Sequence, residues 1–211
     1  MIKITIPGPM TIKDTVGNTY YKNEADLYAD LIVTIQKEIA ELIKHGCKII
    51  QIDEPVLARY PKEALQYGIS NIEKCFENVG DNILKGVHIC CGYPDKLEET
   101  DYPKADPNAY FTIAEKLNNS KINFISIEDA HRKVNDDFFK IMTNKIIILG
   151  VLNISTIEIE SENEIEERVK HILKYIPKER LWLAPDCGLG MLPKDIAIKK
   201  LKNMVNVTKK L

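Results

Sequence analysis

Two residue types that bind zinc stand one residue apart in the triplet His88-Ile89-Cys90. In a β-strand the side chains of residues i and i+2 point to the same face, so His88 and Cys90 can reach one metal ion. Glu128 and Cys187 each follow another apolar, strand-like run. Zn²⁺ accepts imidazole nitrogen, thiolate and carboxylate ligands in tetrahedral geometry. These residues therefore form a candidate zinc site.

The same residues also fit a site without metal. An H-x-C triplet is far less specific than paired C-x-x-C motifs. Cys90 and the adjacent Cys91 can equally be buried apolar thiols, and His88 can be a hydrogen-bonded core residue. Spacing alone leaves both interpretations open.

Other polar residues also follow strand-like runs. Asp53 and Glu54 can act as general acid or base, bind a substrate amino group, or only cap the end of a strand. His131 can contact substrate or support the site, and Ser155 follows the fifth run. Ligands of parallel α/β proteins bind at the carboxyl ends of the strands. We therefore expect these side chains at one edge of a sheet.

Six short runs rich in Ile and Val predict the strands. They are continuous rather than alternating, as is typical of strands covered on both faces. Amphipathic, helix-like segments separate them. The predicted strands are Ile2–Ile6, Lys48–Ile52, Val87–Cys90, Phe124–Ile127, Ile146–Leu152 and Leu181–Ala184. The predicted helices are Glu24–His45, Pro61–Phe76, Pro107–Leu117, Asn135–Met142, Asn163–Tyr175 and Pro193–Met204.

This alternation predicts an α/β fold with parallel strands joined by right-handed helical crossovers. The phosphate-binding motifs G-x-G-x-x-G and G-x-x-x-x-G-K-[ST] are absent, which favours a TIM-type (β/α) barrel over a nucleotide-binding open sheet. Such a barrel takes about 250 residues. The chain has 211 residues and six strand-helix units. We therefore expect a single domain over residues 1–211 that forms an incomplete barrel without its first units.

Composition and charge exclude several function classes. The chain has 29 Lys and Arg against 31 Asp and Glu, a net charge of −2, and no long basic run, which argues against nucleic-acid binding. The apolar runs are far shorter than the roughly 20 residues of a membrane span, and no secretory signal opens the chain. An odd number of cysteines, five, argues against a disulfide framework. We expect a cytoplasmic protein.

Several sequence blocks resemble the catalytic barrel of cobalamin-independent methionine synthase, and most closely the shorter members that lack its N-terminal barrel. The blocks follow the family order along nearly the whole chain: Ile6–Thr11, Gln51–Pro55, His88–Cys90, Ser126–Glu128, Pro177–Trp182 and Pro185–Leu189. The resemblance implies a zinc site with the ligands His88, Cys90, Glu128 and Cys187. It also implies that Asp53 contacts the amino group of a homocysteine-like thiol, and it places Ser155 where the family usually has a histidine.

The implied activity is zinc-dependent methyl transfer to the thiol of homocysteine or a similar compound, giving a thioether such as methionine. A free thiol has a pKa of about 8.5, and zinc removes its proton and holds the thiolate as a nucleophile. The incoming sulfur needs a coordination position, and Glu128 is the ligand that we expect to leave. Asp53 and Glu128 are thus the expected catalytic residues. The methyl donor stays open between a methylfolate and a methylcorrinoid.

Two other functions remain open. An incomplete barrel has two sheet edges that can pair with another chain, which fits a non-catalytic or partner-dependent subunit that binds a metal or a corrinoid. A barrel related to uroporphyrinogen decarboxylase, which needs no metal, is the third possibility. The expected partners are thus a small-molecule thiol and a methyl donor, together with a second copy or a companion chain that completes the barrel.

Overall fold

A computed structural model describes residues 2–92, 94–99 and 104–210 of the chain. Six parallel strands form one sheet in sequence order, so β1 and β6 are its edges among the described residues. The strands are β1 (Lys3–Pro7), β2 (Ile49–Asp53), β3 (Leu84–Ile89), β4 (Phe124–Ile127), β5 (Ile146–Leu152) and β6 (Leu181–Pro185). The predicted parallel α/β fold is confirmed. That the chain is a single domain, or pairs with a companion at these edges, stays a prediction.

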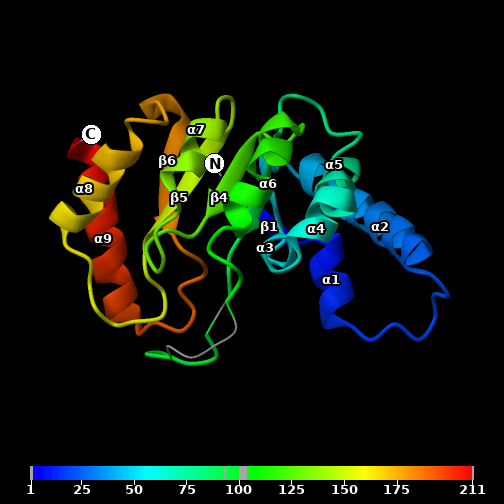
Figure 1. The fold of residues 1–211 in the computed structure, drawn as a ribbon, viewed down its shortest axis with the longest axis horizontal. Helices are drawn as coiled ribbons and strands as arrows, with labels where there is room; N and C mark the ends of the chain where they lie inside the picture. The colour runs from blue at the N-terminus through cyan, green and yellow to red at the C-terminus, as the bar shows by residue number, and fades with distance from the viewer. Residues whose placement is uncertain (1, 93, 100–103, 211) are drawn as a thin grey trace.

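In the view of Figure 1 the helices flank the sheet. Helices α8 and α9 lie beside β6, and α1, α2, α4 and α5 lie toward the opposite edge. The α-helices are α1 (Pro9–Thr15), α2 (Glu24–Lys44), α3 (Val56–Arg59), α4 (Pro61–Glu63), α5 (Ile69–Cys75), α6 (Ala109–Asn119), α7 (Asp136–Ile141), α8 (Glu162–Ile172) and α9 (Lys194–Lys210). A π-helical turn, η1 (Ala64–Gly68), joins α4 to α5, and a 3₁₀ turn, η2 (Lys178–Arg180), precedes β6. The segment predicted as one helix over Pro61–Phe76 is helical from Pro61 to Cys75, with this π-helical turn in its middle.

The sequence did not predict α1 and α3, because helices of one or two turns carry too few residues for a periodic pattern. Longer helices begin where polar side chains satisfy their first amides. The Asn23 side chain accepts a hydrogen bond from the Asp26 amide at the start of α2. Ser161 and Glu164 form a reciprocal capping box at the start of α8. These caps fix the loops that precede the two helices.

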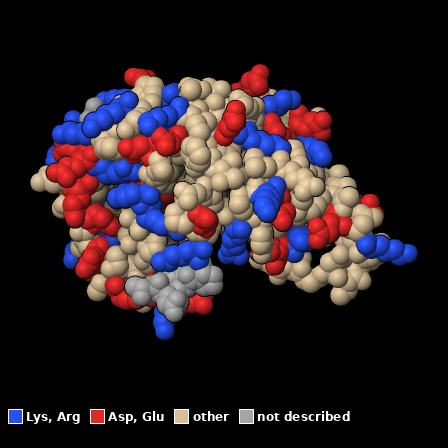
Figure 2. Space-filling view, viewed as in Figure 1, with Lys and Arg blue, Asp and Glu red and all other residues tan. Residues whose placement is uncertain are grey.

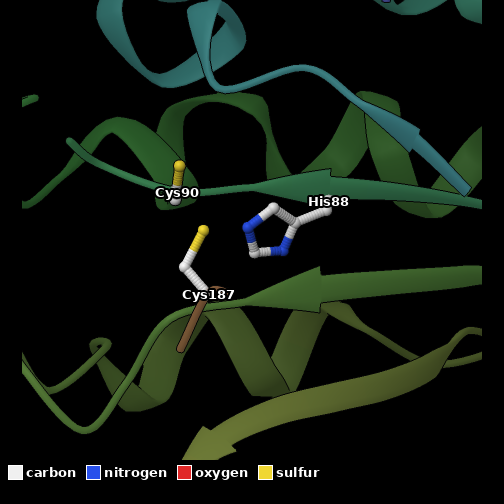
Figure 3. Close-up of side chains that lie close together, drawn as sticks. All are labelled: His88, Cys90 and Cys187. Carbon is white, nitrogen blue, oxygen red and sulfur yellow. The ribbon is translucent and has the colours of Figure 1, made fainter. Parts of the chain in front are cut away.

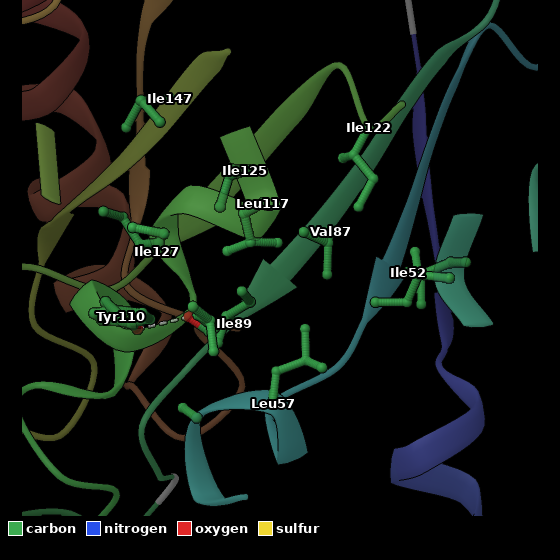
Figure 4. Close-up of a cluster of buried hydrophobic side chains, with 14 of the residues drawn as sticks. Ile52, Leu57, Val87, Ile89, Tyr110, Leu117, Ile122, Ile125, Ile127 and Ile147 are labelled. Carbon is green, nitrogen blue, oxygen red and sulfur yellow. Dashed lines mark hydrogen bonds between the residues drawn. The ribbon is translucent and has the colours of Figure 1, made fainter. Parts of the chain in front are cut away.

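The two faces of the sheet bury different sets of side chains. On the outer face a large apolar cluster joins the strands to the helices, with Ile52, Val87 and Ile125 among its members (Figure 4). Leu117 of α6 packs into the same cluster, and the hydroxyl of Tyr110 in α6 donates a hydrogen bond to the Ile89 carbonyl at 2.7 Å. This packing fixes the carboxyl end of β3 against the helical layer.

The inner face has a separate small cluster of Ile49, Phe124 and Ile148, with Trp182 packed against it. Phe124 depends on Gly86 of the neighbouring strand. A Cβ atom at Gly86 would lie 2.0 Å from the Phe124 ring, so only glycine leaves room for the ring above β3. The inner face is therefore closed by apolar side chains toward the amino ends of the strands.

Positive and negative side chains alternate over the visible surface, without a region of one sign (Figure 2). This distribution agrees with the net charge of −2. Among the described residues, none of the helices has the length and the apolar character that crossing a membrane requires.

We predict that Gly86→Ala destabilises the protein by about 1–3 kcal/mol, because the added methyl group forces Phe124 out of its position. Chemical denaturation of the two proteins measures the change. Gly17→Ala is the matched control, because nothing lies within 4 Å of a Cβ atom at Gly17. A Gly86→Ala protein as stable as the control would contradict this account of the inner face.

Candidate metal centre

Three side chains with metal-binding atoms converge at the carboxyl ends of β3 and β6 (Figure 3). His88 is on β3, Cys90 directly follows that strand, and Cys187 follows β6. A ligand atom of each lies within 4.8 Å of one from each of the others. Strands β4 and β5 lie between β3 and β6 in the sheet, so the curvature of the sheet brings the residues together.

The ring of His88 is oriented by one hydrogen bond. Its Nδ1 lies 3.0 Å from the hydroxyl of Ser126, which faces His88 in the register of β3 and β4. Its Nε2 is buried and has no hydrogen-bond partner. A buried polar atom without a partner is costly, and a metal ion would satisfy it. Hydrogen bonds of this kind commonly orient histidine ligands of metal ions.

The two thiols interact directly. A hydrogen bond from the Cys90 thiol favours the thiolate of Cys187 and, despite burial, lowers the pKa of Cys187. The same hydrogen bond, together with burial, raises the pKa of Cys90. Burial alone would lower the pKa of His88, but the Cys187 sulfur and the charge of Asp53 outweigh it and raise that pKa. Such a set of one imidazole and two thiols suits zinc.

Glu128 follows β4 and is 5% exposed, but it is not part of the group of converging ligand atoms among the described residues. Burial and the neighbouring charge of Asp186 raise the pKa of Glu128 to about 7. Interactions with Cys91 and Arg132 oppose this shift. The carboxylate is close enough to Cys90 for its charge to raise the thiol pKa. Its role as fourth ligand stays a prediction.

Asp53 lies beside the cluster, because it faces His88 in the register of β2 and β3. The Gln51 side-chain amide donates a hydrogen bond of 2.8 Å to Asp53, and the Lys3 ammonium donates one of 2.6 Å to Gln51. Burial raises the pKa of Asp53 although the charge of His88 opposes it. Asp53 is thus an acidic group held next to the candidate metal ligands.

Glu54 lies elsewhere, fully buried at the start of α1. Its carboxylate accepts hydrogen bonds from the Met10 amide at 3.0 Å and from the amide and hydroxyl of Thr11. Burial raises the pKa of Glu54 to about 7 in spite of these donors. A Cβ atom at Gly8 would lie 2.1 Å from the Glu54 carboxylate, so glycine is needed there. In this structure the Glu54 carboxylate binds the first turn of α1, and substrate contact by Glu54 stays a prediction.

A small pocket beside the cluster brings four of the predicted residues together. Its lining includes Glu128, His131, Ser155, Cys187, Asn153 and Asp186. The Ser155 hydroxyl donates a hydrogen bond of 2.7 Å to the Asn153 side chain. Burial, with the charges of Lys104 and Arg132, lowers the pKa of His131. Substrate contacts by His131 and Ser155 fit this position and remain predictions.

Sequence reasoning missed the residues that hold these loops in place. The ammonium of Lys200 on α9 is fully buried and donates hydrogen bonds to the Asn153 carbonyl at 2.9 Å and to Glu160 at 3.0 Å. No signal in the sequence distinguishes Lys200 from the exposed lysines around it. Ser126 carried a signal that was overlooked, since it is a polar residue inside an apolar strand.

The family profile described as "Cobalamin-independent synthase, Catalytic domain" matches residues 1–92 and 102–210. The chain belongs to the cobalamin-independent methionine synthase family. It is 35% identical to a methionine synthase of Saccharolobus solfataricus and 32% identical to one of Pyrococcus horikoshii, in each case over 99% of its own length. It spans 58% and 56% of those two proteins.

A solved structure of a B12-independent methionine synthase from Shewanella sp. W3-18-1, in complex with selenomethionine, matches with a TM-score of 0.87 and 26% identity. The match covers 98% of this chain and 61% of that one. The expected TIM-type barrel architecture is thus confirmed for this family member, with six of its parallel strands in the described residues.

We predict that Lys200→Met destabilises this family member by about 3–5 kcal/mol, because it leaves Glu160 partly buried and without its charge partner. Thermal or chemical denaturation measures the effect. Lys199→Met is the control, because Lys199 is exposed and lies 3.9 Å from Asp195, a pair expected to contribute about 0–1 kcal/mol. Equal stabilities of the two variants would rule out a structural role for the buried pair.

Proposed function

We propose that this chain catalyses zinc-dependent methyl transfer to the thiol of homocysteine, with a methylfolate as donor. The observation that carries the proposal is the buried Nε2 of His88, which has no hydrogen-bond partner and lies beside the thiols of Cys90 and Cys187. Membership of the cobalamin-independent family supports the same activity and gives no support to the corrinoid donor.

His88, Cys90 and Cys187 would hold the zinc. The bound zinc would supply acidity, lowering the pKa of a coordinated substrate thiol so that it acts as a thiolate nucleophile. The protein's contribution begins with orientation, because Ser126 holds the His88 ring with Nε2 directed away from β4. His88 and Cys90 are buried and Cys187 is half-buried, which limits competition from water.

Glu128 would be the fourth residue to hold the metal, and the one whose place a substrate thiol could take. A carboxylate suits this role because thiolates bind zinc more strongly than carboxylates do. Interactions of Cys91 and Arg132 with Glu128 favour its charged form in the position that the structure shows. These two residues would stabilise the carboxylate when it is away from the metal.

Asp53 would pair with the ammonium group of the substrate amino acid. Its carboxylate is held by the side-chain amide of Gln51 and lies close enough to His88 and Cys187 for their charges to interact. An amino acid whose sulfur is at the metal would thus have its amino group near an acidic partner. His131 and Ser155 would line the adjoining pocket.

We expect purified protein to contain about one zinc ion per chain, and His88→Ala and Cys90→Ser to remove most of it, because each deletes a ligand of a closed tetrahedral set. Atomic absorption measures the metal. Cys47→Ser is the control, because Cys47 lies before β2 and outside the converging group. Protein with less than about half an equivalent of zinc, unchanged by the two variants, would overturn the site.

The thiol acceptor has a separate test. Zinc-edge X-ray absorption should show one additional sulfur ligand and one fewer oxygen ligand when homocysteine is added, since the substrate sulfur replaces Glu128. Methylfolate and methylcobalamin, supplied in parallel turnover assays, distinguish the donors. Zinc with an unchanged shell would contradict the homocysteine proposal while leaving the metal site intact.

We predict that Ser126→Ala weakens zinc binding by about 10- to 100-fold, as is usual when a hydrogen bond to a histidine ligand is lost. Competition with a chromophoric chelator measures the affinity. Ser70→Ala is the control, since the Ser70 hydroxyl only bonds the Tyr67 carbonyl on the outer helices. Equal affinities for the Ser126 and Ser70 variants would show that the His88 ring needs no such support.

A further inference from the structure

Asp186, which directly precedes Cys187, makes an unusual set of contacts with the loop after β4. Its carboxylate accepts hydrogen bonds from three consecutive amides, those of Asp129 and Ala130 at 2.9 Å and that of His131 at 2.7 Å. Its side chain is buried, with 2% of the residue exposed. The loop that follows Glu128 is therefore attached to the residue that precedes Cys187.

This contact has to cross a strand, because β5 lies between β4 and β6 in the sheet. The crossing occurs at Gly150 of β5. A Cβ atom at Gly150 would lie 2.3 Å from Oδ1 of Asp186 and 2.9 Å from the Ile127 carbonyl. The Asp186 oxygen takes part in the contact and the Ile127 oxygen belongs to the backbone, so neither can move away freely. A side chain at Gly150 would therefore force the ends of β4 and β6 apart.

An irregularity in the pairing of β5 and β6 directs Asp186 toward the loop. The register passes from Gly150 opposite Ala184 to Leu152 opposite Pro185, so one strand has an extra residue. The Asp186 amide then donates a hydrogen bond of 3.0 Å to the Leu152 carbonyl. Such bulges bend a strand and re-aim the side chains that follow.

The other side of the loop is held independently. The carboxylate of Asp129 is fully buried and accepts two hydrogen bonds of 2.7 Å from the guanidinium of Arg168 on α8. It also accepts one of 2.7 Å from the Val134 amide. The loop is thus fixed to the helical layer by Asp129, while Asp186 connects it to the end of β6.

We infer that Asp186 is a positioning residue that sets the place of Glu128 relative to Cys187. Glu128 and Cys187 come from strands that are not neighbours, and the contact between Asp186 and residues 129–131 joins the two chain segments directly beside them. Gly150 and the bulge make this contact possible. The effect of Asp186 on metal coordination rests on the proposed function, whereas the contact between Asp186 and residues 129–131 does not.

The first test uses the metal-free protein. In Asp186→Asn and Gly150→Ala, amide hydrogen exchange should become about tenfold faster at residues 129–131, because each amide loses one hydrogen bond. Exchange at the Val134 amide should stay unchanged. Asp137→Asn is the control, because Asp137 is an exposed acid of the following helix. Exchange that rises equally across the whole protein would show a general loss of stability and overturn the positioning role.

The second test uses zinc-loaded protein. Asp186→Asn should weaken zinc binding about 10- to 100-fold, and its zinc-edge spectrum should keep both sulfur ligands while the oxygen ligand from Glu128 is lost. Asp186→Ala should show the larger effect, since it removes every acceptor. If the amides of residues 129–131 exchange faster while zinc keeps its oxygen ligand from Glu128, the inference is overturned. A wild-type chain that binds no zinc would instead refute the proposed function, and the exchange measurement would still test the connection.

Discussion

The ring of Phe124 sets the distances on which the rest of the site depends. It lies over Gly86 of β3 and packs against Trp182 of β6, with ring centroids 6.4 Å apart and planes 28° from parallel. One side chain of β4 thus spans the inner face from β3 to β6. Because the sheet curves around these rings, the carboxyl ends of β3 and β6 approach each other, and His88 and Cys90 meet Cys187.

Above this apolar layer, most of the buried polar groups that we describe are bound to protein partners. Arg168 pairs with Asp129, Lys200 with Glu160, and Glu54 with the start of α1. Each pair anchors a loop or a helix at the carboxyl edge of the sheet. His88 Nε2 and Arg132 Nη2 are the buried side-chain atoms in the described part of the chain that have no partner. His88 belongs to the converging ligands, where a metal ion would bind its free nitrogen. Arg132 lies near Glu128, where its guanidinium would interact with that carboxylate.

Much of the fold was predictable because parallel strands leave a clear pattern. Short apolar runs located the six strands of the sheet, although β3 begins at Leu84 rather than Val87, since Lys85 and Gly86 interrupt its apolar character. The short helices α1 and α3 were missed. Their starts depend on distant partners, such as the Glu54 carboxylate that binds the amides of α1, and no local pattern records such a contact.

Which residues stand at the ends of the strands can be read from the amino-acid sequence. Side-chain period and strand order are enough to predict His88, Cys90, Glu128 and Cys187 on one edge of the sheet. Which of them converge depends on the three-dimensional fold, because distances between strands three apart depend on sheet curvature and inner-face packing. It brought His88, Cys90 and Cys187 within 4.8 Å and left Glu128 outside that group. It also decided the partners of Asp186 and Lys200, since a buried charge is bound by whatever the fold places beside it.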